Sequence, residues 1–221
     1  MPTVFSAKLD GSEAVRFTHI SLVVFYLRQS RARAIAAASI SSGEEQFAEA
    51  LLAVILAALC LEAFANECGE DIFDGGELSD FLRCRRGHQK PDGIGSVAWK
   101  LNTVFEKKWK HSLLGSSDVL QDVEALFELR NALVHYKLGE SAAKTYLPPP
   151  EQFANPETGD FLTVIDFELQ PTRFEEPLVR RVNPASAAHA YNTALVVLKL
   201  WNEKAGAPPE ALAAHAVLSE R

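Results

Sequence analysis

Cysteine is scarce in this chain of 221 residues, and its placement argues against two classes of protein. The three cysteines are Cys60, Cys68 and Cys84. They form no CxxC pair and no Cys/His spacing typical of zinc, and an odd number does not fit a disulfide framework. We therefore expect small buried thiols, no metal or other cofactor, and a reducing, cytoplasmic setting.

Several other signals are missing as well. The sequence contains no internal repeat, no low-complexity tract and no glycine-rich phosphate loop. The apolar run Ile20–Leu27 is internal and is followed by arginines, which does not fit a secretory leader. Ala50–Leu61 is apolar on all sides but too short to cross a bilayer. It predicts a helix buried at the centre of a bundle.

Charge is moderate overall and unevenly distributed. The formal net charge is −7, which argues against bulk binding of polyanions. The segment Arg83–His111, however, has eight basic residues against two acidic ones, so it carries +6 and the rest of the chain carries −13. A charge run of this kind is usually a solvated helix face, but it is also the natural contact for an RNA backbone. The basic residues assigned to RNA are Arg83, Arg85, Arg86, Lys107, Lys108 and Lys110, with Trp99, Trp109 and His88 available for stacking.

Helical spacing of apolar residues dominates the sequence, whereas Met1–Val15 has little pattern. We predict an all-α fold, an up-and-down bundle of about five to six helices. Capping residues, glycines and prolines set the expected helix limits. The expected helices are His19–Ser39, Ser42–Cys68, Leu78–Cys84, Ser96–Lys110, Asp118–Leu138, Asn183–Lys204 and Pro209–Ser219.

The region before Asn183 differs from the rest in being rich in proline and in β-formers. Ser141–Asp160 contains four prolines and predicts an exposed loop. Phe161–Leu169 predicts a strand, and Arg173–Val182 is its expected edge partner. We therefore predict one domain over 1–221, with a core of about 19–139 plus 184–205 and a strand or hairpin insertion at about 140–182.

The helix expected over Asp118–Leu138 carries the most informative polar residues. Its apolar residues form one broad arc, and Arg130 falls inside that arc. A buried guanidinium needs a partner or access to water. Asn131 and His135, one expected helical turn apart, flank Arg130, so a cation, an amide and an imidazole are predicted on one side of one helix.

Arg130-Asn131-x-x-x-His135 resembles the Rx4H signature of the HEPN family. The likeness is strongest over Leu126–Lys137 and is supported by the earlier helix Glu49–Glu67. The resemblance implies a metal-independent endoribonuclease that forms a 2′,3′-cyclic phosphate and acts as a homodimer, with Arg/His pairs from two copies in one site. It also implies a toxin–antitoxin, defence or stress setting, with RNA and an antitoxin or nucleotidyltransferase as partners.

The residue types suit that chemistry. An arginine fork matches phosphate oxygens, and a histidine titrates near neutral pH and can act as base or acid. Arg130 is assigned to phosphate stabilisation, His135 to acid–base work and Asn131 to positioning. Glu62 and Asn66, one turn apart on the earlier helix, are expected to line the same cavity, and Tyr136 lies beside the histidine. Some HEPN toxins carry a modified tyrosine two residues after the histidine, a position held here by Lys137.

Two alternatives stay open at this point. Many HEPN proteins keep the fold without nuclease activity and serve as dimerisation, nucleotide-binding or protein-binding modules, which is the second hypothesis. The third is a structural helical protein in which Arg130 forms an ion pair with Glu62 and His135 is a surface residue beside a loop.

Overall fold

The computed structural model of this chain describes residues 3–10, 13–84, 94–113, 117–136, 142–155, 157–159 and 161–205. Several predictions lie outside these ranges. They include the roles of Arg85, Arg86 and His88 and the final helix Pro209–Ser219.

The chain forms two compact units. The first is Met1–Val134 with Val182–Arg221, and the second is His135–Arg181. Within the described residues the first unit contains β1 (Thr3–Asp10), β2 (Glu13–Ile20), α1 (Val23–Ser39), α2 (Glu44–Ile72), α3 (Gly75–Arg83), α4 (Ser96–Trp109), α5 (Ser117–Val134) and α7 (Pro184–Ala205). The second contains β3 (Lys144–Tyr146), β4 (Glu151–Ala154), β5 (Phe161–Val164), β6 (Arg173–Glu175) and α6 (Leu178–Arg181). Most described residues are helical, as the all-α prediction required.

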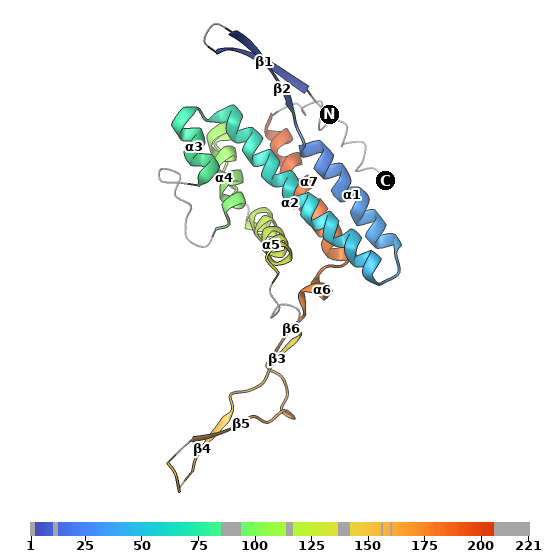
Figure 1. The fold of residues 1–221 in the computed structure, drawn as a ribbon, viewed down its shortest axis with the longest axis vertical. Coiled ribbons are helices and arrows are strands. Elements are labelled where there is room, and N and C mark those ends of the chain that lie inside the picture. The colour runs from blue at the N-terminus through green and yellow to red at the C-terminus, as the bar shows by residue number, and fades with distance from the viewer. Residues whose placement is uncertain are drawn as a thin grey trace. The chain divides into compact units, whose positions relative to one another are not determined.

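Helix α2 is the centre of the first unit, with α1, α4, α5 and α7 around it (Figure 1). Small residues let the helices approach closely. Ala53 and Ala57 of α2 and Ala37 of α1 are fully buried. Larger side chains fill the space toward α4 and α7, where the Trp201 ring meets Phe64 and Phe105 edge to face. The helix predicted over Ala50–Leu61 is confirmed as part of α2, but it is not buried on all sides, because Leu52 is 40% exposed.

The prediction that this helix ends at Gly69 is wrong, because α2 continues to Ile72. The reason lies in packing. A Cβ on Gly69 would lie 2.1 Å from Cε1 of Phe81, so the glycine makes room for an aromatic ring of α3. Phe81 in turn stacks on Phe73 at 4.8 Å between ring centroids. Gly69 is therefore a packing residue within the helix and not a cap.

At 29 residues, α2 is also long and apolar enough to cross a membrane by length and composition alone. The stretch Ala50–Leu61, which is too short to cross a bilayer, is only the middle part of this helix. The core helix of a soluble protein passes the same test. In this structure, 44% of the most apolar 18-residue window is buried by the surrounding helices.

The first twenty residues contain a hairpin that the pattern analysis did not predict. β1 and β2 pair antiparallel from Thr3↔Ile20 to Asp10↔Glu13. Consequently α1 begins at Val23, four residues later than expected. The sequence does contain a signal for this hairpin. Asp10-Gly11-Ser12 lies between two stretches rich in Val, Phe and Thr, a combination typical of a hairpin.

The second unit is built from nested antiparallel ladders. β3 pairs with β6, and β4 pairs with β5. The expected pairing of 161–169 with 173–182 is therefore wrong, as is the loop expected across 141–160, since β3 and β4 both lie there. The outer ladder is supported by Arg173, whose guanidinium lies 4.0 Å from the centroid of the Tyr146 ring.

The chain re-enters the helical unit at the start of α7, where the predicted cap is present. Oδ1 of Asn183 accepts hydrogen bonds from the backbone N–H groups of Ala185 (3.0 Å) and Ser186 (3.1 Å), and Pro184 is the first helical residue of α7. The predicted cap and first-turn proline are confirmed.

Candidate functional site

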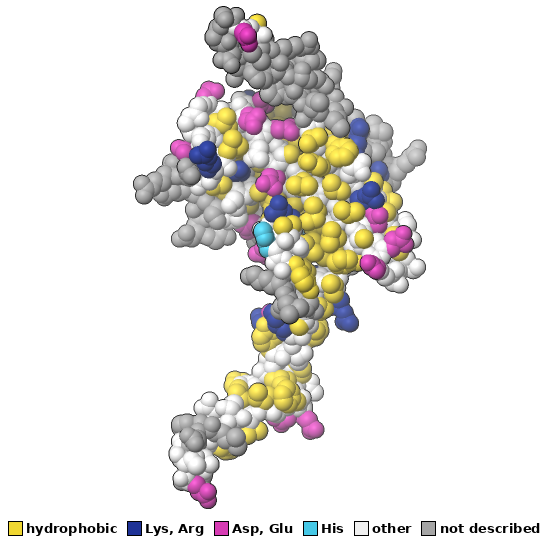
Figure 2. Space-filling model, viewed as in Figure 1, with side chains coloured by type: hydrophobic (Ala, Val, Ile, Leu, Met, Phe, Trp, Pro, Cys, Tyr) yellow, Lys and Arg dark blue, Asp and Glu magenta, His cyan; other side chains and the backbone are white. Residues whose placement is uncertain are grey.

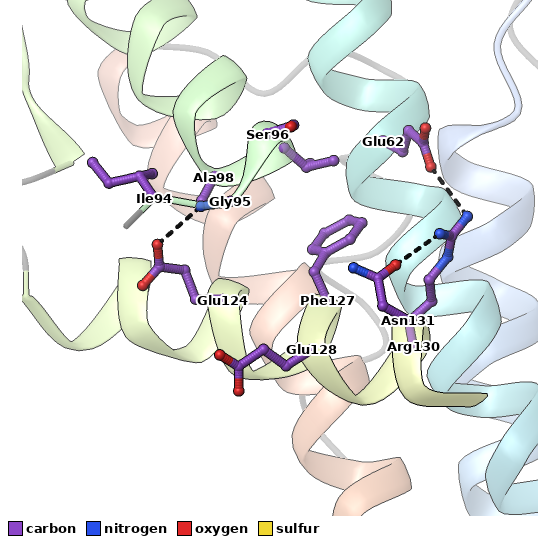
Figure 3. A pocket seen from close by; sticks show the side chains of 11 residues that line it. Glu62, Ile94, Gly95, Ser96, Ala98, Glu124, Phe127, Glu128, Arg130 and Asn131 are labelled. Atoms are coloured by element: carbon purple, nitrogen blue, oxygen red, sulfur yellow. Dashed lines mark hydrogen bonds and ion pairs between the residues drawn. The ribbon is translucent and has the colours of Figure 1, made fainter. Parts of the chain in front are cut away.

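Arg130, near the end of α5, faces α2. Its Nη2 lies 3.8 Å from Oε2 of Glu62, and its Nη1 donates a hydrogen bond to Oδ1 of Asn131 at 3.0 Å (Figure 3). The arginine side chain is 25% exposed and the glutamate side chain 42%, so solvent reaches one side of this ion pair. The contact expected between Arg130 and Glu62 is present, and the guanidinium keeps access to solvent.

A pocket of about 520 Å³ opens beside this pair, between α2, α5 and the start of α4. The Phe127 ring and the backbone of Gly95–Ala98 form much of its wall (Figure 3). Oε1 of Glu124 accepts a hydrogen bond from the backbone N–H of Gly95 at 3.3 Å, which ties the beginning of α4 to α5. The lining residues are Glu62, Ile94, Gly95, Ser96, Val97, Ala98, Glu124, Phe127, Glu128, Arg130 and Asn131.

The charge of this lining is negative. Glu62, Glu124 and Glu128 supply three carboxylates against one guanidinium, so the formal sum is −2. A phosphate that entered would meet repulsion from the glutamates unless Arg130 turned from Glu62 toward it. A cationic or amide-bearing ligand would meet complementary charge.

His135 and Tyr136 follow the last residue of α5, and both side chains are exposed. The helix was expected to continue to Leu138, which is wrong. Leu133 still packs against the core, whereas Val134 is 51% exposed, so the apolar surface that supports α5 ends at the last residue of the helix. His135 follows the last helical residue directly, so its spacing of one turn from Asn131 and the roles of His135 and Tyr136 stay predictions.

Asn66 contacts a different residue from those expected. Its Oδ1 accepts a hydrogen bond from Nζ of Lys100 on α4 at 3.0 Å, and it is not among the residues that line the pocket. Lys100 is only 9% exposed, although a basic segment of this kind is usually a solvated helix face. A buried ammonium needs an acceptor. Asn66 supplies one, and the Phe81 ring lies 5.6 Å from the same nitrogen.

The basic segment is only partly available as a continuous surface. Arg83, Lys107, Lys108 and Lys110 are exposed. Lys107, however, forms a 3.0 Å ion pair with Glu77. Contact of these residues with RNA stays a prediction.

The two tryptophans offered for stacking have structural neighbours. Trp99 is 7% exposed and belongs to the core. Trp109 packs edge to face against Trp201, with ring centroids 5.4 Å apart. These contacts do not favour either ring as a platform for bases.

The cysteines do not form a nucleophilic site. Cys60 and Cys68 are buried, and burial raises the pKa of both thiols well above the ordinary range, so the reactive thiolate is disfavoured. Cys84 is partly exposed at the end of α3.

Three lining residues of α5, Glu124, Phe127 and Glu128, were missed by sequence reasoning although the sequence contains a signal for them. Together with the predicted Asn131 they recur at i, i+3, i+4 and i+7, which places them on one face of α5. The contribution of Gly95–Ala98 had no comparable signal, because it depends on how α4 docks against α5.

Comparisons with known proteins add no family assignment, because no family model, curated protein or solved structure matches this chain. The HEPN resemblance therefore rests on Arg130, Asn131, His135 and the helical context.

Proposed function

We propose that this protein is a HEPN-like, metal-independent endoribonuclease that acts as a homodimer in the cytoplasm. Arg130 binds the phosphodiester, Asn131 positions Arg130, and His135 transfers protons. The observation that supports this proposal is the placement of Arg130 at the rim of a pocket, part-exposed and within 3.8 Å of a carboxylate that an incoming phosphate can replace. Charge-assisted pairing of guanidinium with phosphate is strong enough to compete with one half-exposed glutamate.

The test is cleavage of RNA by the purified full chain in the presence of EDTA. We expect products that end in a 2′,3′-cyclic phosphate. Arg130→Ala and His135→Ala should each lower the rate by at least about 100-fold, the scale of a lost acid–base or phosphate-stabilising group.

Two surface variants serve as matched controls. Arg28→Ala removes an exposed arginine of α1, and His189→Ala removes an exposed histidine of α7 that lies 3.4 Å from Asp122. Both should cleave like the parent chain. Cleavage that persists in the Arg130 and His135 variants would remove the proposed site.

A second candidate function is favoured by the negative lining of the pocket. A catalytically silent HEPN-like module would use the same pocket for a protein ligand with cationic or amide groups, which the three glutamates suit. Such a protein would cleave no RNA, and its ligand affinity would fall when Glu124 and Glu128 are both replaced by glutamine. A nuclease with the same replacements would bind RNA more tightly.

A further inference from the structure

The outward side of α2 carries an apolar stripe formed by Leu52, Ile55, Leu56 and Leu59, here called the α2 stripe. The spacing i, i+3, i+4 and i+7 places all four on one face of the helix. Leu52 is 40% exposed, and the other three are half-buried. Within the described part of the chain, none of the four belongs to, or packs against, either buried core cluster. Figure 2 shows hydrophobic side chains gathered over this face, where α2 and α1 lie side by side.

The charged residues at the ends of the stripe make it symmetric. Glu49 lies three residues before Leu52, and Glu62 lies three residues after Leu59. Each glutamate is paired with an arginine from a neighbouring helix. Arg33 of α1 lies 3.0 Å from Glu49, and Arg130 of α5 lies 3.8 Å from Glu62. Read in either direction along α2, the face runs glutamate, leucine, two aliphatic residues, leucine, glutamate.

We propose that the α2 stripe is the docking surface for a second copy of this chain, with the two α2 helices antiparallel. A twofold interface requires a surface that is complementary to itself. The reversed order of the stripe meets this requirement, because Leu52 then lies opposite Leu59 of the second copy and Ile55 opposite Leu56. The two ends of the stripe are neutral ion pairs, so the surface has no net charge that would select a strongly acidic or basic partner.

This inference assigns a surface to the homodimer of the proposed function, but it does not depend on cleavage of RNA. In the antiparallel arrangement, the Arg130–Glu62 pair of one copy lies next to the Arg33–Glu49 pair of the other. Because Glu49 and Glu62 are 13 residues apart and a helix rises about 1.5 Å per residue, the two Arg130–Glu62 pairs lie about 20 Å apart along the helices. The two Arg130 sites are therefore separate in this dimer, unlike the single shared site that the HEPN resemblance implies.

Sedimentation velocity over a range of protein concentrations tests the surface. The full chain should form dimers. Leu56→Glu, at the centre of the stripe, and Leu52→Glu, near its end, should each weaken dimerisation at least about 100-fold by placing a carboxylate in the apolar interface. Val196→Glu is the matched control, since Val196 of α7 is 46% exposed and lies outside the stripe. It should dimerise like the parent chain. Circular dichroism of each variant establishes that the helices are intact.

Cross-linking tests the antiparallel register in a Cys84→Ser background, which removes the partly exposed thiol. A mixture of Leu52→Cys and Leu59→Cys chains should cross-link with a short bis-maleimide more efficiently than either chain alone. A chain that stays monomeric, or a dimer that survives both glutamate substitutions, would overturn the proposed surface. Preferential cross-linking of Leu52→Cys with itself would overturn the antiparallel register. Neither result depends on whether the protein cleaves RNA.

Discussion

Arg130 already has two acceptors within its own chain, and this determines how the residue can work. Glu62 and Asn131 together hold the guanidinium, at 3.8 and 3.0 Å, with a quarter of the side chain exposed. A phosphate must therefore replace an existing partner and does not meet a free cation. The contacts with Glu62 and Asn131 hold the Arg130 side chain in place. The negative charge of Glu62 also lowers the attraction of Arg130 for an anion.

Replacing Glu62 by glutamine separates these two effects. The side chain keeps its shape, but the pocket loses one of three negative charges and Arg130 loses its ion pair. We expect RNA to bind about two- to five-fold more tightly, the scale of a part-exposed ion pair. Binding titrations at several salt concentrations measure this change.

The control for this substitution is Glu175→Gln, which removes a carboxylate paired with Lys144 and Arg173 in the second unit. It should leave RNA affinity unchanged. Weaker binding by the Glu62→Gln chain would show that Glu62 mainly orients Arg130 and does not compete with the phosphate.

At the scale of single residues, the sequence predicted a contact correctly where a charged side chain in an apolar surface had one nearby partner of opposite charge. Arg130 in an apolar arc required a partner, and Glu62 was the carboxylate on the neighbouring apolar helix. Lys100 had no such signal, because its burial depends on the rotation of α4 about its own axis. Periodicity gives that rotation only approximately when lysines and apolar residues alternate along a helix.

Among the elements, the junction of α2 with α3 depends on Gly69. The Phe81 ring occupies the space that a side chain at position 69 would need. Gly69→Ala should lower the free energy of unfolding by about 1–3 kcal/mol through overpacking, despite the higher helix propensity of alanine. Chemical denaturation measures the loss.

A smaller residue at position 81 provides the internal control for this packing. Phe81→Leu creates space beside the new methyl group, so the double variant should lose less stability than the sum of the two single variants. Additive losses would mean that the clash is relieved elsewhere in the helix.

Element boundaries were the least predictable part of the fold. Caps with a complete local signal, such as Asn183-Pro184 before α7, were placed correctly. The end of α5 was not, because the sequence through Tyr136 and Lys137 still resembles a helix while the supporting apolar surface ends at Val134. The strand pairs of the second unit were also missed, since their registers join segments up to 31 residues apart and depend on which edges meet.

At the scale of the whole molecule, the chain leaves and re-enters the helical unit at one place. Val182 is buried in the cluster that contains Ala37, Ala50 and Ala187, and Leu133 packs against the same cluster. The intervening unit is built from two-stranded ladders of three or four residues and exposes Phe153, Phe167 and Phe174. Ladders of this length have little stability of their own.

We therefore expect the helical unit to fold without the second unit. Replacing residues 137–180 by a short glycine–serine linker should leave the helical circular dichroism per residue of the remaining chain and a single cooperative unfolding transition. Loss of both would show that the second unit supports the core.

The full chain with Phe167→Ser is the control for surface effects. Phe167 is 80% exposed, so its replacement should change solubility more than unfolding.

The closeness of Leu133 and Val182 also has a practical consequence. Because these two positions are neighbours in the helical unit, a fluorescent or affinity module can be inserted between them without changing either end of the chain. A reporter placed there would move with the helical unit, so that self-association of the protein could be followed by energy transfer between differently coloured copies.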